Sequence, residues 1–188
     1  MEEIMKKLLM VLALVLGSSV SHAASGGGSG FGVGLSYFMY NLTLDGDNFA
    51  SPSESKNSVM DIKLGYLMSN GLYLGVLSDS SSSNDGTGAL AGSGLAASVG
   101  YHMNGFMVDL NYFLSGTQEI SSTSKYTSGS GIGLDFGYNH MLSSSFYLGV
   151  ELSYKSLSFA KAEVSGAETT VKNSAVSTMP MLNLGFMF

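Results

Sequence analysis

Six charged residues in the chain stand among small and apolar neighbours, where they could build ion-binding or hydrogen-bonding chemistry. An unpaired charge in such a setting is costly, so each is expected to need a partner of opposite charge. Lys155 could pair with Asp135 or Glu151, and Lys63 with either of the two remaining acids. The set predicts structural ion pairs or a narrow, weakly cation-preferring path. The six residues are Asp61, Lys63, Asp109, Asp135, Glu151 and Lys155.

Catalytic groups are scarce in the sequence. Beyond the N-terminal region only His102 and His140 remain, and the chain has no Cys. Ser-His-acid chemistry needs a Ser and an acid within hydrogen-bond reach of the His. Ser is so frequent here that a nearby Ser carries no information. We therefore predict no enzymatic activity, no cofactor and no metal site, and keep a lipid-modifying enzyme as a minor alternative.

The secondary-structure elements that hold the six charges can be predicted from a strict alternation of apolar and small or polar residues along the chain. Apolar residues occupy every second position in eight segments, which is the pattern of β-strands. The intervening positions hold mostly Gly, Ser and Asn, together with the six charges and a few large residues such as Tyr73 and Tyr147. The fold class predicted is all-β, a closed antiparallel up-and-down transmembrane β-barrel. The segments are 31–39, 60–68, 72–76, 95–103, 106–114, 132–138, 146–154 and 180–188.

The connections between these segments alternate in kind. Three are tight turns, around Asn70-Gly71, Asn104-Gly105 and residues 142–145, and Asn-Gly is the strongest hairpin signal. Between the turns lie polar stretches rich in Ser, Gly, Thr and Asp, from which we predict four long extracellular loops. Short turns at one rim and long loops at the other are typical of outer-membrane barrels. The predicted loops cover 45–57, 79–88, 116–128 and 160–173.

Alternation alone does not decide which face of the barrel meets water. A soluble, lipocalin-like barrel would need many charges on its outer, polar face, and the polar face here carries only six. The apolar face is uniformly large and bears Tyr residues at two heights, as in the aromatic girdles of membrane barrels. We therefore predict that the apolar face contacts lipid. The girdle residues are Tyr37, Tyr66, Tyr101, Tyr112, Tyr138 and Tyr154.

The N-terminal region has the features of an export signal. Lys6 and Lys7 precede a short apolar run, and small residues flank His22 as a cleavage site requires. We predict a cleaved signal peptide at 1–23, a Gly/Ser-rich leader at 24–30 and the barrel at 31–188. The net charge of −6 with no Arg argues against nucleic-acid binding.

The last segment carries a family resemblance. It ends on an aromatic residue, with apolar residues at every second position before it, and is similar to the C-terminal signal recognised by the outer-membrane barrel assembly machinery. With eight strands and four loops, the chain resembles the small outer-membrane barrels of the OmpX and OmpA-transmembrane type over residues 30–188. Pro180 departs from a regular strand and predicts a bulge or the margin of the strand. The signal residues are Leu182, Leu184, Phe186 and Phe188.

Together these features predict an integral protein of a Gram-negative outer membrane. Its partners would be outer-membrane lipid, the barrel assembly machinery and an extracellular partner bound by the loops. The expected role is structural or surface interaction, and the narrow pore is the main alternative.

Overall fold

The computed structural model describes residues 29–44, 53–84 and 89–188, and in this part of the chain every regular element is a strand. No helix among these residues is long and apolar enough to cross a membrane. The predicted signal peptide and most of the predicted leader lie outside the described residues, although β1 already begins at Gly30. The strands are β1 (Gly30–Leu44), β2 (Ser53–Leu67), β3 (Leu72–Asn84), β4 (Ala89–Met103), β5 (Phe106–Ser121), β6 (Ser124–Met141), β7 (Phe146–Val164) and β8 (Ala167–Met187).

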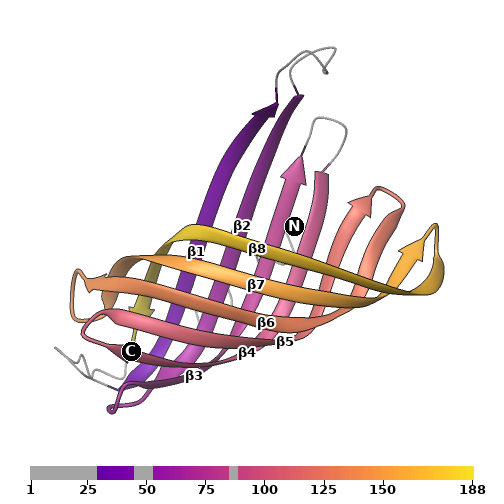
Figure 1. Cartoon of the computed structure of the whole chain (residues 1–188). Helices are drawn as coiled ribbons and strands as arrows, with labels where there is room; N and C mark the ends of the chain where they lie inside the picture. Colours follow the sequence, from indigo (N-terminus) through magenta and orange to yellow (C-terminus); the bar gives the residue numbers. More distant parts are fainter. Residues whose placement is uncertain (1–28, 45–52, 85–88) are drawn as a thin grey trace.

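The eight strands form one antiparallel sheet that closes on itself. Each strand pairs with its neighbours in sequence, and β1 pairs with β8 to complete the ring. The ring is uneven, because the hairpins diverge from one another at the end opposite the tight turns (Figure 1). The predicted all-β, up-and-down closed barrel of eight strands is therefore confirmed.

The three predicted tight turns are present and define one rim, called here the short-turn end. Asn104 and Gly105 have φ values of 52° and 88°, the left-handed conformation that Asn-Gly adopts readily in a two-residue hairpin. Gly71 has a φ of 87°. The opposite rim, where β7 and β8 join, is called the hairpin end.

The four long loops were predicted incorrectly wherever the structure describes them. The chain at 116–128 and 160–173 forms paired strands joined by two-residue turns at 122–123 and 165–166. In the same way β2 begins at Ser53 and β3 continues to Asn84, while 45–52 and 85–88 lie outside the described residues. Ser, Thr and Gly favour turns in isolation, but an antiparallel partner satisfies their backbone groups equally well, so pairing overrides local preference.

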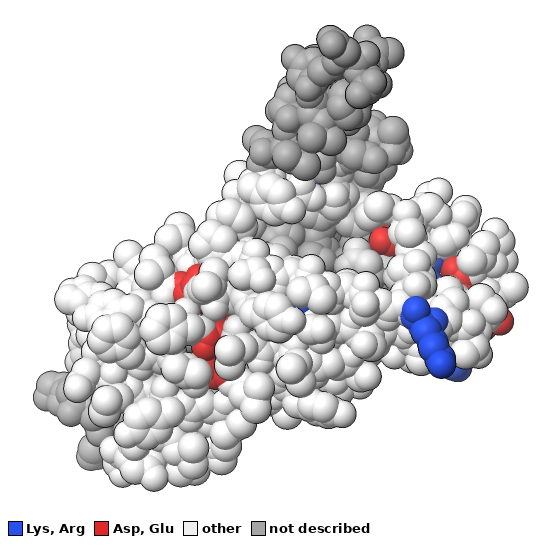
Figure 2. All heavy atoms as spheres, viewed as in Figure 1, with Lys and Arg blue, Asp and Glu red and all other residues white. Residues whose placement is uncertain are grey.

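The side chains divide between the two faces as the alternation predicts. The described charges of the central barrel are buried inside, whereas Leu74, Val108 and Leu134 on the outer face are each more than 40% exposed. A small apolar core of Leu77, Ala96 and Phe113 fills part of the interior. On the face drawn in Figure 2 most atoms belong to uncharged residues; acidic atoms are visible in the half nearer the short-turn end, and exposed Lys atoms lie at the hairpin end.

The pairing of β1 with β8 is short. It covers only Gly32–Tyr37 against Leu182–Met187, although β8 is 21 residues long. Pro180 lies two residues beyond the last pair on β8. The Phe188 N–H is donated to the Phe31 carbonyl on β1, so in a regular strand every second residue back from Phe188 also points its N–H toward β1. Pro180 is one of these and has no N–H to donate.

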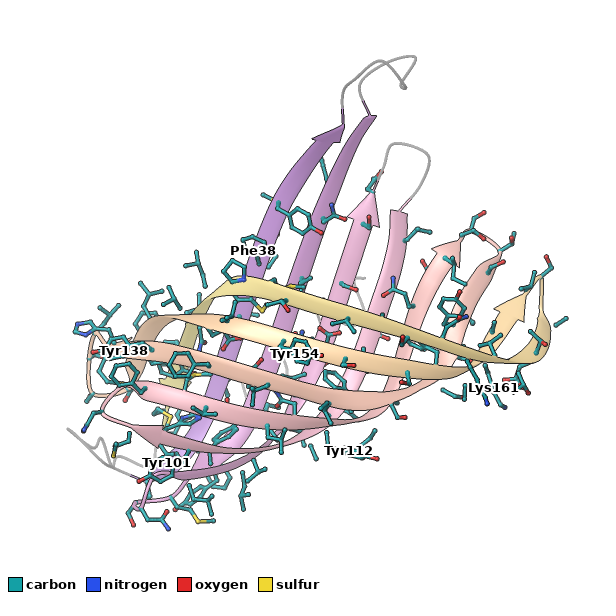
Figure 3. The ribbon with its side chains drawn as sticks, viewed as in Figure 1. Phe38, Tyr101, Tyr112, Tyr138, Tyr154 and Lys161 are labelled. Carbon is teal, nitrogen blue, oxygen red and sulfur yellow. The ribbon has the colours of Figure 1, made fainter. Side chains whose placement is uncertain are left out.

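The prediction for Pro180 was therefore wrong in its details. No bulge occurs there, and β8 continues far beyond it. Instead, Pro180 follows the last β1–β8 pair in the direction of the hairpin end, where the two strands separate. Phe38, the first β1 residue beyond this seam, is visible near the point of separation in Figure 3.

Candidate functional site in the barrel interior

The part of the interior nearer the short-turn end contains a group of charged side chains around the ammonium of Lys63, called here the Lys63 cluster. Nζ lies 2.8 Å from Asp135 Oδ2 and 3.2 Å from both Asp109 Oδ2 and Glu151 Oε2. All four side chains are at least nine-tenths buried. The strand alternation places each of them on the inner face. Of the two predicted partners for Lys63, Asp109 is correct, while Asp61 pairs elsewhere.

A second group, the Lys155 cluster, lies nearer the hairpin end. Lys155 Nζ lies 2.7 Å from Asp61 Oδ1 and 2.5 Å from Asp79 Oδ1. The predicted pairing of Lys155 with Asp135 or Glu151 was wrong. Lys155 on β7 reaches across the interior to β2 and β3, and such contacts depend on the tilt of the strands, which alternation does not reveal.

Asp79 was missed because it was assigned to a loop. It is inward-facing and buried on β3, two positions beyond Leu77 and four beyond Gly75. Continuing the alternation of that strand would have found it. The interior of the described barrel therefore holds five carboxylates, where the sequence predicted four.

Neutral polar side chains link the charged groups. Asn111 Nδ2 donates to Asp135 Oδ2 at 2.8 Å, and Ser98 Oγ donates to Asn111 Oδ1 at 2.5 Å. Asn183 Nδ2 lies 3.1 Å from Asn139 Oδ1 and 3.5 Å from Glu151 Oε2. Together with the apolar core around Phe113, these side chains occupy the middle of the barrel interior.

His102 is not simply an interfacial side chain. Its Nε2 lies 2.7 Å from Asp109 Oδ1, and its ring stacks on Tyr73 with centroids 4.9 Å apart. Asp109 therefore bridges His102 and Lys63, using one carboxylate oxygen for each. His140 at the end of β6 is exposed. The described contacts of His102 include no serine, so they do not form a Ser-His-acid arrangement.

Two inward tyrosines lie over glycines. A Cβ at Gly65 would lie 2.5 Å from ring atoms of Tyr73, and a Cβ at Gly34 would lie 2.7 Å from the Tyr147 hydroxyl. Glycine at these positions gives the rings room to lie flat against the inner wall. The sequence showed these tyrosines on the minor face, but it did not show that they and the glycines shape a cavity.

That cavity opens at the short-turn end and has a volume of about 480 Å³. Its polar lining includes Lys63, Asp109, His102, Asn139 and Asn183. Met107 and Met187 supply apolar surface beside the two tyrosines, Tyr73 and Tyr147. A volume of this size is typical of pockets for small molecules.

Several buried oxygens of the barrel interior lack a hydrogen-bond partner within the described structure. They include Asp135 Oδ1, Ser153 Oγ and Asn183 Oδ1, on residues whose exposed fraction is 2% or less. Buried polar atoms are normally satisfied, so these oxygens mark places where a donor or a cation would be favourable. Across the described ranges, no three His, Cys, Asp or Glu residues are grouped so as to hold a metal ion.

The six tyrosines of the predicted girdle all lie on the outer face. Tyr101 and Tyr138 lie toward the short-turn end, and Tyr112 and Tyr154 lie farther along the wall (Figure 3). Tyr66 and Tyr138 make edge-to-face contacts with Phe31 and Phe106, with centroids 5.0 Å apart in both pairs. The exposed fractions of the six tyrosines range from 36% for Tyr66 to 57% for Tyr112. The other four, in order of increasing exposure, are Tyr154, Tyr138, Tyr37 and Tyr101.

The residues of the predicted C-terminal signal lie on the outside of β8. Leu182, Leu184 and Phe186 are exposed, and Phe188 follows directly after the strand. Comparison with known proteins adds no assignment, since no protein family matches the sequence and no curated protein matches it significantly.

Proposed function

We propose that this chain is an integral outer-membrane barrel whose hairpins project beyond the membrane and serve a structural or surface-interaction role. The observation that carries the proposal is the reversal of the usual polarity of a folded protein. Charged residues are buried at the centre of the barrel, while its outer wall exposes a continuous belt of large apolar side chains. An apolar surface of this extent requires a partner. Lipid suits a closed ring of strands because the strands pair their backbone groups with one another, and β1 and β8 do so over Gly32–Tyr37 and Leu182–Met187.

The lengths of the strands support the second half of the proposal. A membrane-spanning strand needs about 9–11 residues, whereas β7 and β8 have 19 and 21. The surplus forms a polar extension held by exposed ion pairs, such as Lys161 with Glu168 at 3.0 Å and Lys125 with Glu163 at 3.1 Å. Tyr126 stacks on Phe159 beneath these pairs. The extension is therefore an ordered surface that could be recognised.

Single-cysteine labelling tests this proposal, because the chain contains no native Cys. Ala167→Cys at the hairpin end is expected to react with a membrane-impermeant maleimide on intact Gram-negative cells. The matched control, Ser144→Cys in a short turn, should react only after the outer membrane is permeabilised. Both variants should fractionate with outer membranes and migrate differently on gels before and after boiling.

Two outcomes would reject the proposal. Recovery of the folded protein from the periplasm without detergent would show that the apolar belt is covered by something other than lipid. Labelling of Ser144→Cys but not Ala167→Cys on intact cells would reverse the orientation and remove the hairpins from the cell surface.

A further inference from the structure

The Lys63 and Lys155 clusters lie next to each other inside the barrel. Asp61 and Lys63 are neighbouring inward residues of β2, and each belongs to a different cluster. The two lysines cross the interior in opposite directions, because Lys63 reaches from β2 to β5, β6 and β7, whereas Lys155 reaches from β7 to β2 and β3. The two clusters are therefore adjoining parts of one charged column, and the region between the two ammonium groups is called here the junction.

The junction contains buried oxygen atoms that have no hydrogen-bond partner within the described structure. Ser153 on β7 lies between Glu151 of one cluster and Lys155 of the other. Ser36 on β1 is the cross-strand neighbour of Asp61 on β2. The residues that carry these atoms are each no more than 3% exposed. The unpartnered atoms are Ser36 Oγ, Asp61 Oδ2, Asp135 Oδ1, Glu151 Oε1 and Ser153 Oγ.

Water is the ligand that fits these atoms. Buried polar groups without a protein partner normally bind ordered water, which can donate to two acceptors at once. Within the described ranges the acidic groups are not arranged to hold a metal ion. Asp135 lies directly opposite Ser153 in the ladder between β6 and β7. Water that donates to Asp135 Oδ1 and Asp61 Oδ2 would join the two clusters into one hydrogen-bonded network.

Both ends of this network reach solvent. At the short-turn end, His102 lines the cavity and contacts Asp109, whose other oxygen contacts Lys63. At the other end, the side chain of Asp79 keeps 10% of its surface exposed. The described interior holds five carboxylates and two lysines. Such an excess of acidic groups can take up protons without leaving an unpaired positive charge.

We propose that water at the junction joins the two clusters into a path that carries protons through the barrel. Chains of Asp, Glu and His inside membrane-spanning segments are typical of proton relays. In the first half of the path, Asp79 takes up a proton, and Lys155 receives it while giving one of its own to Asp61. The proposal rests on the membrane-spanning role proposed above, because a proton path has an effect only where the barrel separates two compartments.

The second half of the path begins at the junction, where water takes the proton from Asp61 and gives one to Asp135. Lys63 receives it from Asp135 and gives one of its own to Asp109. Asp109 passes the proton to His102, which releases one to water in the cavity. One proton has then entered and one has left, and every group has returned to its starting charge.

Proton flux through the full chain in phosphatidylcholine liposomes tests the path. An outward potassium gradient with valinomycin drives protons inward, and enclosed pyranine reports the internal pH. Acidification should accelerate in proportion to the inserted protein. Asp61→Asn keeps the shape and leaves Lys155 paired with Asp79, but removes the proton carrier at the junction, so it should slow the protein-dependent rate at least about tenfold. The matched control is Glu168→Gln in an exposed ion pair away from the path, which should conduct as the unmodified chain does.

Flotation with the liposomes and boiling-dependent gel migration show whether each variant is inserted and folded. Failure of the unmodified chain to insert would reject the membrane role and the path with it. An inserted chain whose liposomes acidify no faster than protein-free ones would reject the path alone. Undiminished flux through folded Asp61→Asn would also reject it. So would potassium or chloride flux, without valinomycin, as fast as the proton flux, since the interior would then be an open pore.

Discussion

Lys155 illustrates how charges are tolerated inside this barrel. Its ammonium contacts Asp61 and Asp79 from two other strands, and the three side chains are buried together. A buried ion pair contributes little net stability compared with an apolar replacement, but removing one partner leaves the other charge without compensation. The Lys155 cluster is therefore most sensitive to changes that unbalance it.

Replacing Lys155 with Met is expected to destabilise the folded barrel by roughly 3–5 kcal/mol, because two buried carboxylates would then face each other without a cation. Adding Asp61→Asn and Asp79→Asn to this variant should restore most of the loss. Reversible urea unfolding in detergent measures the free energy. The control is Lys161→Met, whose exposed pair with Glu168 is expected to contribute less than about 1 kcal/mol. Equal losses at both lysines would contradict the difference expected between a buried and an exposed pair.

At the scale of the element, the seam between β1 and β8 ends two residues before Pro180, which cannot donate a backbone hydrogen bond. Pro180 removes the donor that would continue the ladder toward Met39, the position opposite it if the register of Tyr37 with Leu182 continued. Backbone groups without partners at a strand edge are a liability in a sheet. Beyond the seam, β1 and β8 do not pair with each other, so they leave such edge groups there.

Pro180→Val is expected to extend the β1–β8 ladder by restoring that N–H. The amide of Met39 should then exchange its hydrogen with solvent more slowly. Residues 39 and 180 would form a hydrogen-bonded antiparallel pair, in which each residue donates its N–H to the carbonyl of the other. Hydrogen exchange monitored residue by residue checks this, with the amides of β3 and β4 as an internal reference. Unchanged exchange at Met39 would mean that something other than the missing donor separates the strands.

The strands also show what could be predicted from the sequence. The assignment of Leu134 to the outer face and Asp135 to the inner face needs only the two-residue period, and it is correct. The ends of the strands could not be predicted, because residues such as Ser80 to Ser83 favour turns locally and become strand only through their partner. The partners of Lys155 could not be predicted for a related reason, since Lys155 and Asp61 meet across the interior of the ring and not as neighbours on adjacent strands.

At the scale of the whole molecule, the wall and the hairpin extension are separable. The β7–β8 hairpin beyond Phe159 contacts the outer half of β6 and does not take part in closing the ring. This part of the hairpin should therefore shape the surface of the molecule without adding to the stability of the barrel wall.

Replacing residues 161–170 with a two-residue turn is expected to leave the proposed outer-membrane location and boiling-dependent gel migration unchanged, while changing the adhesion or envelope phenotype of the cell. Assays of cell adhesion and of detergent sensitivity, in the same strain, check this. A matched variant with Lys161→Ala and Glu168→Ala, which keeps the hairpin length, separates loss of shape from loss of charge. If both variants behave as the unmodified protein in every assay, the hairpin has no surface role.

The short seam also has a consequence for the order of assembly. Every other strand pair is a hairpin between neighbours in sequence, whereas β1 and β8 join residue 32 to residue 187. Bringing such distant segments together costs more chain entropy than forming a hairpin, and contacts of long sequence separation form slowly. Six residue pairs must offset that cost. Closure of the ring is therefore expected to be the last step of folding, and the seam is the place where the native ring first opens.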